Sequence, residues 1–181
     1  RDRLRSRGLG DVYKRQRLGP SAVSTSGTSL LSEAGRRALW EELLPLSTLV
    51  TPNLPEAQVF SGQPVETEGD MLRAAREISR RCRCAVLIKG GHLAGDAADL
   101  LYEEGKALWL RTRRISNPNT HGTGCTLSSA IASNLAKGYD LDESVERAKE
   151  YISGALAAML DLGHGSGPMN HMFALKGAFT E

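Results

Sequence analysis

The chain has 181 residues, of which 40% are hydrophobic and 24% charged, with a formal net charge of +2. This composition is ordinary for a globular protein, and the length suffices for one domain with a buried core. The sequence contains neither an apolar run long enough to span a membrane nor the apolar segment of a secretory signal. Three cysteines, Cys82, Cys84 and Cys125, lack the paired spacing of a zinc site, and we interpret the Cys82–Cys84 spacing as incidental. Reduced thiols and no signal predict a cytoplasmic chain.

The first 16 residues differ from the rest, because they are basic and have no sustained period. Residues 11–16, DVYKRQ, are similar to a translated transposon mosaic-end sequence of the kind used in sequencing libraries. We therefore expect residues 1–16 to be a non-native leader and residues 17–181 to be the C-terminal portion of a single domain. Six basic and two acidic residues give the leader a charge of +4, which leaves −2 for the remainder. The net charge therefore gives no support for nucleic-acid binding.

The first half of the remaining chain alternates between helix and strand patterns. Residues 22–24 are predicted to be a strand remnant. Ser32 is expected to cap a helix that runs to about Leu44 and is ended by Pro45, and residues 46–51 are predicted to form a buried strand. A short helix then begins within residues 52–56, with Pro55 in its first turn, and is ended by Gly62.

A longer helix is predicted after Thr67, from residue 68 to about 81. Its inward face carries Met71, Leu72, Ala75 and Ile78. Residues 85–89 form a continuous apolar run that is typical of a strand covered on both faces. Residues 99–102 and 107–110, separated by a Glu104–Gly105 turn, predict a hairpin.

Two further helices complete the pattern. Residues 128–137 have apolar residues at helical spacing and are followed by Gly138, a left-handed stop. Residues 140–143 resemble a capping box with Asp140 in place of serine. They precede a long helix predicted to end near Gly163. Its apolar face carries Val145, Ala148, Ile152, Ala155 and Met159. Strands alternating with helices predict an α/β layered fold.

The stretch from 119 to 127, NTHGTGCTL, is the strongest candidate for a binding site. A glycine-rich turn that leads into a helix presents unpaired N–H groups and the positive end of the helix dipole. These features favour an anion, and phosphate is a common one. The alternative is a tight turn whose glycines meet only the backbone geometry.

Two other polar clusters follow predicted strands, where α/β folds place their sites. Lys89 at a strand end suits a phosphate, although a lysine that extends to solvent is the alternative. Asn53 and Glu56 are three residues apart and can hold a metal-bound water, or they can simply cap a helix. Cys125 near a helix N-terminus would have its thiolate favoured by the dipole, or it can be a small buried apolar residue.

Together, residues 51–57 (TPNLPEA), 86–92 (VLIKGGH) and 121–128 (HGTGCTLS) resemble hydroxymethylpyrimidine/phosphomethylpyrimidine kinase of thiamine biosynthesis, in the ribokinase-like superfamily. Residues 163–171 (GHGSGPMNH) are similar to that family's C-terminal segment. The resemblance is colinear from about Leu18 to Phe173. It implies an α/β fold with a mostly parallel sheet and helices on both faces.

The resemblance also implies an activity, which is ATP-dependent phosphorylation of 4-amino-5-hydroxymethyl-2-methylpyrimidine and then of its monophosphate. Gly122, Thr123, Gly124 and Cys125 would surround the transferred phosphoryl group. Lys89 would neutralise phosphate charge, while Asn53 and Glu56 would position Mg²⁺ or its waters. We interpret Cys125 as a base or as a group that orients the substrate hydroxyl, because phosphoryl transfer needs positioning and charge stabilisation more than covalent chemistry.

Two departures from the family pattern limit what the resemblance implies. Gly19 occupies the position at which the family has an aspartate near the metal. In addition, the first two-fifths of the family's length, which contains most of the pyrimidine pocket, precedes the matching region. Only Ser21 and Val23 would remain from that pocket. Pyridoxal kinase of the same superfamily and a non-catalytic nucleotide-binding fragment are therefore the alternatives. The expected partners are the small-molecule pyrimidine and ATP, with no nucleic acid or membrane, and homo-oligomerisation is left open.

Overall fold

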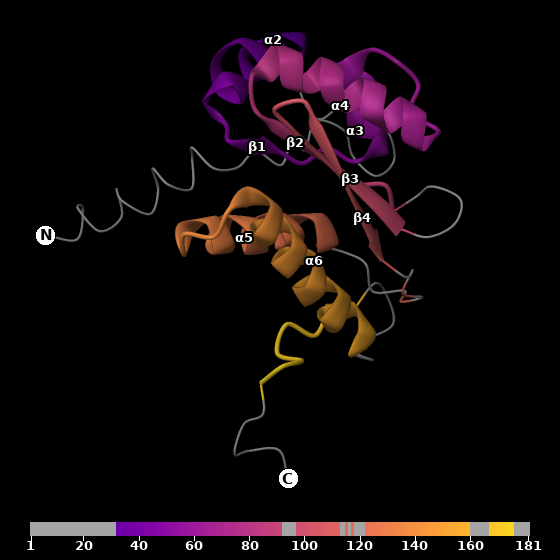
Figure 1. Cartoon of the computed structure of the whole chain (residues 1–181), viewed down its shortest axis with the longest axis vertical. Coiled ribbons are helices and arrows are strands. Elements are labelled where there is room, and N and C mark those ends of the chain that lie inside the picture. The colour runs from indigo at the N-terminus through magenta and orange to yellow at the C-terminus, as the bar shows by residue number, and fades with distance from the viewer. Residues whose placement is uncertain are drawn as a thin grey trace, which may run out of the picture. The chain divides into compact units, whose positions relative to one another are not determined.

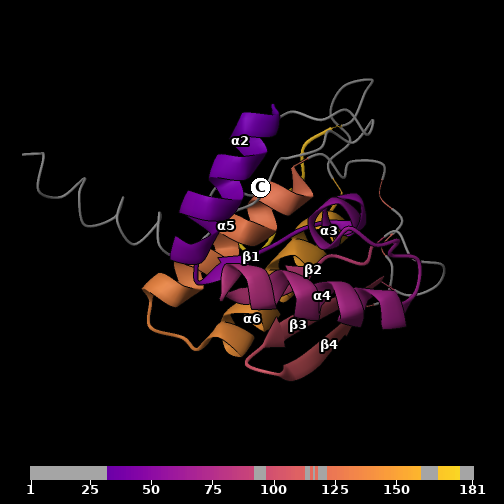
Figure 2. The ribbon, with the colours of Figure 1, turned by 90° about the horizontal axis from the view of Figure 1, so that it is seen from above.

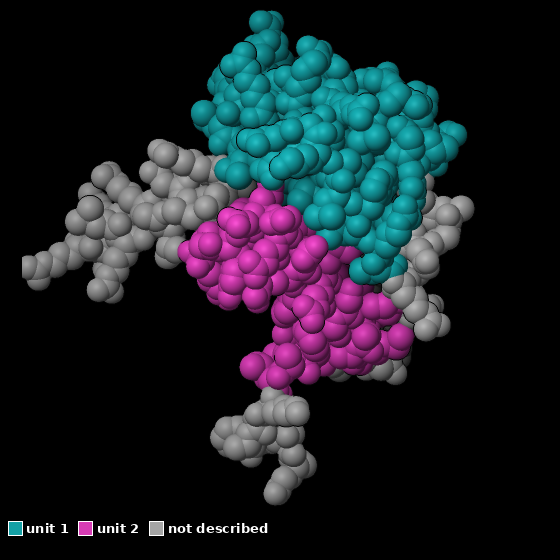
Figure 3. Space-filling view, in the orientation of Figure 1, with its two compact units in different colours: residues 1–114 teal, residues 115–181 magenta. Residues whose placement is uncertain are grey.

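The computed structural model describes residues 32–91, 97–112, 115, 117, 122–159 and 167–175. These residues fall into two compact units, residues 1–114 and residues 115–181, shown in two colours in Figure 3. The predicted strand remnant at residues 22–24 lies outside the described residues. No described helix is long and apolar enough to cross a membrane.

In its described residues, the first unit is a four-stranded mixed sheet with helices (Figure 1). Its strands are β1 (Leu49–Val50), β2 (Ala85–Ile88), β3 (Ala97–Glu103) and β4 (Lys106–Thr112), in that spatial order. β1 and β2 are parallel, with Val50 opposite Val86, whereas β2, β3 and β4 are antiparallel. The predicted hairpin is confirmed. It adds two antiparallel pairs to the one parallel pair, so the described part of the sheet is mixed.

Helices α3 (Leu54–Ser61) and α4 (Glu68–Cys82) pack against each other, and α4 covers β2 and β3 (Figures 1 and 2). Both were predicted, because their ends are encoded locally. Thr67 accepts from the N–H of Asp70 in a capping box, and Gly62 ends α3 at φ 71°. Apolar side chains from these helices form one core with the sheet, including Phe60, Met71 and Ile78.

The segment before β1 differs from its prediction. α2 (Glu33–Ala38) begins after Ser32, whose hydroxyl accepts from the Gly35 N–H as expected. The helix then continues as a π-helix, η1 (Leu39–Leu43), and a 3₁₀ turn, η2 (Leu44–Leu46). Pro45 lies inside η2 and does not end the helix, because proline is tolerated in the first turn of a new segment. Leu46 is 65% exposed and β1 begins only at Leu49, so the prediction of a buried strand from residue 46 was wrong.

The second unit contains α5 (Thr123–Ala136) and α6 (Leu141–Ala157), which pack against each other. Val145, Ala148, Ile152 and Ala155 are buried, as predicted. Met159, assigned to the same face, is 53% exposed because α6 ends at Ala157, before the predicted end. Asp140 is the N-cap of α6, but its side chain makes no capping hydrogen bond, so the capping-box prediction was wrong. Gly138 has the expected left-handed backbone, at φ 93°.

Candidate functional site

Two of the predicted polar clusters lie side by side, at the carboxyl ends of the parallel strands β1 and β2. The N–H of Lys89 donates to the carbonyl of Pro52 at 2.9 Å, and Asn53 pairs with Lys89 in an isolated parallel bridge. The strand ladder therefore continues past β1 and β2 into the polar residues. This arrangement brings Asn53, Glu56 and Lys89 to one edge of the sheet, as the sequence predicted from their positions after two strands.

Asn53 and Glu56 form a reciprocal capping box at the start of α3. The N–H of Glu56 donates to Asn53 Oδ1 at 2.8 Å, and the N–H of Asn53 donates to Glu56 Oε2 at 2.9 Å. Glu56 is buried, with 5% of its surface exposed. The capping interpretation is thus confirmed, but a capping carboxylate at a strand end also suits a cation. Mg²⁺ keeps several waters and takes one or two carboxylates, so this donor set fits a magnesium ion held through water.

The turn after Lys89 depends on Gly90 and on a residue that the sequence analysis missed. The Gly90 N–H donates to Asp99 Oδ1 at 2.9 Å, and Asp99 is buried in β3. A Cβ at Gly90 would lie 2.0 Å from the Ala98 carbonyl oxygen, so only glycine fits this close approach. An acidic residue at the start of an otherwise apolar strand was the signal that could have indicated Asp99. Its carboxylate holds the backbone directly after Lys89.

The predicted anion-binding turn forms the beginning of α5. Gly122 is the N-cap, with a left-handed φ of 81°, and has no side chain to cap the helix. The first helical hydrogen bond runs from the Thr126 N–H to the Gly122 carbonyl at 2.9 Å. The N–H groups of Thr123, Gly124 and Cys125 therefore precede that bond and point toward the N-terminal end of the helix. Cys125 is exposed there, and its thiol is reduced.

Hydroxyl groups in the first turns of α5 bond to the helix itself. Ser128 Oγ donates to the Gly124 carbonyl, and Ser129 Oγ donates to the Cys125 carbonyl, each at 2.9 Å. Thr123 Oγ1 lies 3.7 Å from Met169 Sδ, which attaches the helix start to the segment after α6. The serine protons are therefore used along the helix, and the feature of this first turn that favours an anion is the helix N-terminus itself.

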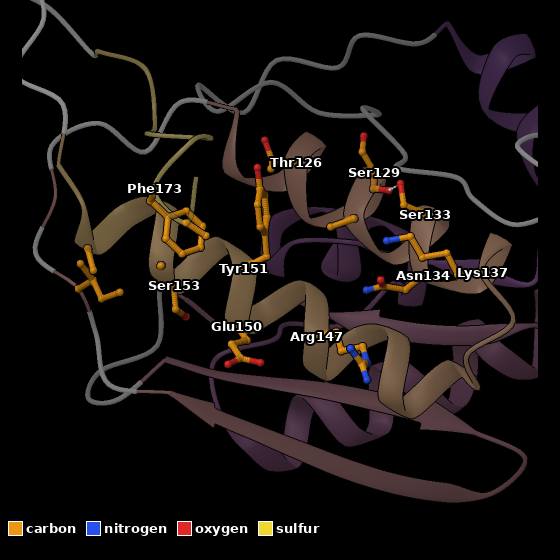
Figure 4. A pocket seen from close by; sticks show the side chains of 15 residues that line it. Thr126, Ser129, Ser133, Asn134, Lys137, Arg147, Glu150, Tyr151, Ser153 and Phe173 are labelled. Atoms are coloured by element: carbon orange, nitrogen blue, oxygen red, sulfur yellow. Dashed lines mark hydrogen bonds between the residues drawn. The ribbon is translucent and has the colours of Figure 1, made fainter. Parts of the chain in front are cut away.

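A cavity of about 1030 Å³ lies farther along the second unit, between α5 and α6 (Figure 4). Thr126 and Ser129 line it from α5 and Lys137 from the C-cap of that helix, whereas Arg147 and Tyr151 line it from α6. Its described lining includes none of the four predicted residues from Gly122 to Cys125. The cavity is therefore separate from the anion-binding turn, although it starts only one residue beyond Cys125.

The predicted residues fall into two groups. Asn53, Glu56 and Lys89 come together in the first unit, and residues 122–125 form the first turn of α5 in the second. Ser21 and Val23, predicted to be the remnant of a substrate pocket, lie outside the described residues. Among the described residues, no group of three or more His, Cys, Asp or Glu side chains could hold a metal by itself.

Comparison with known proteins shows a match over most of the chain. The phosphomethylpyrimidine kinase family model matches residues 13–170. A hydroxymethylpyrimidine/phosphomethylpyrimidine kinase from Streptomyces coelicolor is 46% identical over 156 residues, which is 86% of this chain and 58% of the relative. The chain thus spans less than two-thirds of that curated relative's length.

Solved structures give the same fold. Pyridoxal kinase from Staphylococcus aureus in complex with AMP-PCP aligns with a TM-score of 0.79 at 31% identity, over 87% of this chain and 58% of that one. Phosphomethylpyrimidine kinase from Clostridium difficile aligns with a TM-score of 0.64 at 38% identity, over 75% and 54% of the two chains. The α/β class and the ribokinase-like fold implied by the sequence are confirmed.

Proposed function

This chain belongs to the phosphomethylpyrimidine kinase family, and from that premise we propose that it provides the nucleotide-phosphate part of an ATP-dependent kinase in thiamine biosynthesis. The reaction of the whole enzyme is phosphorylation of 4-amino-5-hydroxymethyl-2-methylpyrimidine and then of its monophosphate. The chain spans 58% of the length of the Streptomyces coelicolor relative.

One observation carries the proposal, namely the start of α5. Gly122, with its left-handed backbone, opens a 14-residue helix whose first N–H groups point outward along the helix axis. Such a terminus has a partial positive charge and a set of donors suited to a phosphate. The turn also lies inside the stretch that the family model matches. We therefore assign the transferred phosphoryl group to residues 122–125.

The other residues have supporting roles in the proposal. The ammonium group of Lys89 neutralises phosphate charge, and Asn53 with Glu56 positions the waters of a magnesium ion. Mg²⁺, bound together with ATP, supplies charge neutralisation at the phosphates. Cys125 is exposed in the same first turn as the proposed donors, which suits a group that orients the substrate hydroxyl or accepts its proton. Ser21 and Val23 are assigned to the edge of the pyrimidine pocket.

These roles match the demands of phosphoryl transfer. The reaction passes through a transition state whose charge is spread over the phosphoryl oxygens, so catalysis consists mainly of positioning and electrostatic stabilisation. Backbone N–H groups at a helix start are fixed before the reaction begins and cost no reorganisation. Removing one such donor from an enzyme typically lowers kcat by about 10²–10³-fold.

The proposed organisation treats residues 17–181 as part of one kinase domain and residues 1–16 as a non-native leader. The family match runs from residue 13 to 170 and crosses the boundary between the two compact units, which supports a single domain. The match also includes residues 13–16 of the proposed leader. The parent DNA tests the leader. Adapter sequence upstream of Leu18 would support a leader, and an uninterrupted genomic reading frame would reject it.

A coupled binding and product assay on the full chain tests the function. Calorimetric titration with ATP, in the presence of Mg²⁺ or of EDTA, measures nucleotide binding. Mass spectrometry then follows the phosphorylated products of the hydroxymethylpyrimidine and of pyridoxal, each supplied with ATP. We expect magnesium-dependent ATP binding and, where turnover occurs, preference for the pyrimidine. No ATP binding would contradict the proposal.

Two alternatives are distinguished by the same assay. Faster phosphorylation of pyridoxal would assign the chain to the pyridoxal kinases, to which it is similar in structure. Binding of ATP without any product would identify a non-catalytic nucleotide-binding fragment. The binding arm therefore tests the phosphate site, and the product arm tests the reaction separately.

A further inference from the structure

Cys82 and Cys84 form a thiol pair that the proposed kinase chemistry does not use. Cys82 is the last residue of α4, and Cys84 lies directly before β2. Their Sγ atoms are 2.7 Å apart, and both residues are buried. Sulfur atoms in a disulfide are about 2.05 Å apart, so only a small approach separates this pair from a bond.

The backbone between the two cysteines accounts for this contact. Arg83 has a left-handed conformation, with φ 56° and ψ 35°, and ends α4 through a hydrogen bond from its N–H to the Ser79 carbonyl at 2.8 Å. Ser79 Oγ also donates to the Cys84 carbonyl at 2.8 Å. The same serine therefore holds both the turn residue Arg83 and Cys84 after it. A left-handed residue at a helix end reverses the chain and brings the flanking side chains together.

The surroundings favour one reactive sulfur in the pair. The hydrogen bond between the two thiols lowers the pKa of Cys82, whereas burial acts in the opposite direction. That hydrogen bond and burial raise the pKa of Cys84. Arg81 adds a nearby positive charge, held by its stacking on Trp40 at 4.0 Å. Cys82 is therefore the attacking thiolate and Cys84 the thiol that resolves.

We propose that Cys82 and Cys84 form an oxidisable dithiol site that closes to an intramolecular disulfide on reaction with hydrogen peroxide. In the first step, the Cys82 thiolate attacks a peroxide oxygen and the O–O bond breaks. A sulfenic acid forms, and the departing hydroxide takes up the proton that the Cys82 thiol had released, which gives water. In the second step, Cys84 Sγ attacks the Cys82 sulfur, the S–O bond breaks, and the Cys84 proton leaves with the hydroxide as water. Two thiols and one peroxide thus yield one disulfide and two waters.

The site lies apart from the candidate phosphate site. Cys84 and Lys89 are five positions apart, on either side of the four residues of β2, which is about 17 Å at the rise of a strand. Burial also limits the oxidant to a small molecule, because Cys82 is fully buried and Cys84 is 8% exposed. A bulky aromatic disulfide reagent should therefore modify the exposed Cys125 much faster than either member of the pair.

Peptide mass mapping of the full chain tests the proposal. The reduced chain is treated with hydrogen peroxide, alkylated under denaturing conditions and digested. We expect the number of alkylated cysteines to fall from three to one, with a peptide containing Cys82 and Cys84 that is lighter by two hydrogen atoms. Cys125→Ser is the matched control and should still form this disulfide. Cys84→Ser should instead leave a sulfenic acid at Cys82, trapped by dimedone.

Several outcomes would overturn the proposal. These are full alkylation of both cysteines after peroxide, oxygen added at the pair without disulfide formation, or a disulfide that joins either residue to Cys125. Release of stoichiometric zinc by peroxide would identify a metal site instead. The wild-type mapping decides between these outcomes even where a cysteine variant fails to fold, because it requires no substitution.

Discussion

Glu56→Gln separates the capping role of this residue from its proposed role toward magnesium. In the structure Glu56 Oε2 accepts from the Asn53 N–H at 2.9 Å, and glutamine at this third helical position can accept the same bond. The capping box should therefore persist. Replacing a charged acceptor by a neutral one weakens a hydrogen bond by roughly 1 kcal/mol, and we expect a loss of unfolding free energy of about that size.

The effect on nucleotide binding should be larger. Removal of a group that orients metal ligands typically costs about 10–100-fold in affinity, and loss of the carboxylate charge should lower magnesium-dependent ATP binding within that range. Binding in EDTA should change little, because the carboxylate acts through the cation. Calorimetric titration of the wild type and the variant, with Mg²⁺ and with EDTA, measures both quantities.

The chain contains a matched control for this substitution. Asp70 occupies the same third position in the capping box of α4, where it accepts from the Thr67 N–H at 2.9 Å. Asp70→Asn makes the same change from acid to amide in a box with no proposed metal role. It should lower stability by a similar amount and leave ATP binding unchanged. Equal magnesium-dependent binding by the wild type and Glu56→Gln would refute the assignment of Glu56.

Three further predictions concern stability, measured by chemical unfolding. Gly90→Ala should lower the free energy of unfolding by about 1–3 kcal/mol, since the new Cβ would lie 2.0 Å from the Ala98 carbonyl oxygen. An unchanged midpoint of chemical unfolding would contradict that close contact. The Arg111 hydrogen bond lowers the pKa of Glu68, so this pair stabilises the folded state above about pH 4.5 and the contribution is lost as the pH falls through the folded pKa. Glu68→Gln should therefore reduce the loss of unfolding free energy at acidic pH. A pH profile of stability identical to that of the wild type would contradict the contribution of this pair. Asp140→Ala should change stability by less than about 0.5 kcal/mol because its side chain makes no capping bond, and a loss typical of a true N-cap would contradict this geometry.

Much of the first unit could be predicted because its signals are local. The caps of α3 and α4 lie within four residues of the helix starts, and the apolar run of β2 is continuous. Pro45 was misinterpreted because its tolerance depends on the switch from a π-helix to a 3₁₀ turn, which the spacing of apolar residues does not encode. The early end of α6 likewise left Met159 exposed, although it continues the apolar spacing.

The polar contacts show a similar division. Asn53 and Lys89 could be placed near each other because both follow parallel strands. Asp99 could not, since its bond to Gly90 depends on how β3 pairs with β2. The contact between Cys82 and Cys84 was interpreted as incidental because a spacing of two residues does not specify the left-handed conformation of Arg83. For both the Asp99 bond and the cysteine contact, the sequence did not specify the path of the backbone that brings the two partners together.

The most direct measurement of the central claim is calorimetric ATP binding to a chain with a carboxylate in the first turn of α5. Gly124→Asp places a negative charge at the second helical position, where the helix dipole favours it and the fold should be retained. Ser133→Asp, on an exposed position roughly two and a half turns along the same helix, is the control with the same change of charge.

If the first turn of α5 binds nucleotide phosphates, Gly124→Asp should weaken magnesium-dependent ATP binding by at least about tenfold, or about 1.4 kcal/mol, through repulsion of the phosphates. Ser133→Asp should stay close to the wild type. Equal ATP affinity for the wild type and both variants would contradict the phosphate site at residues 122–125.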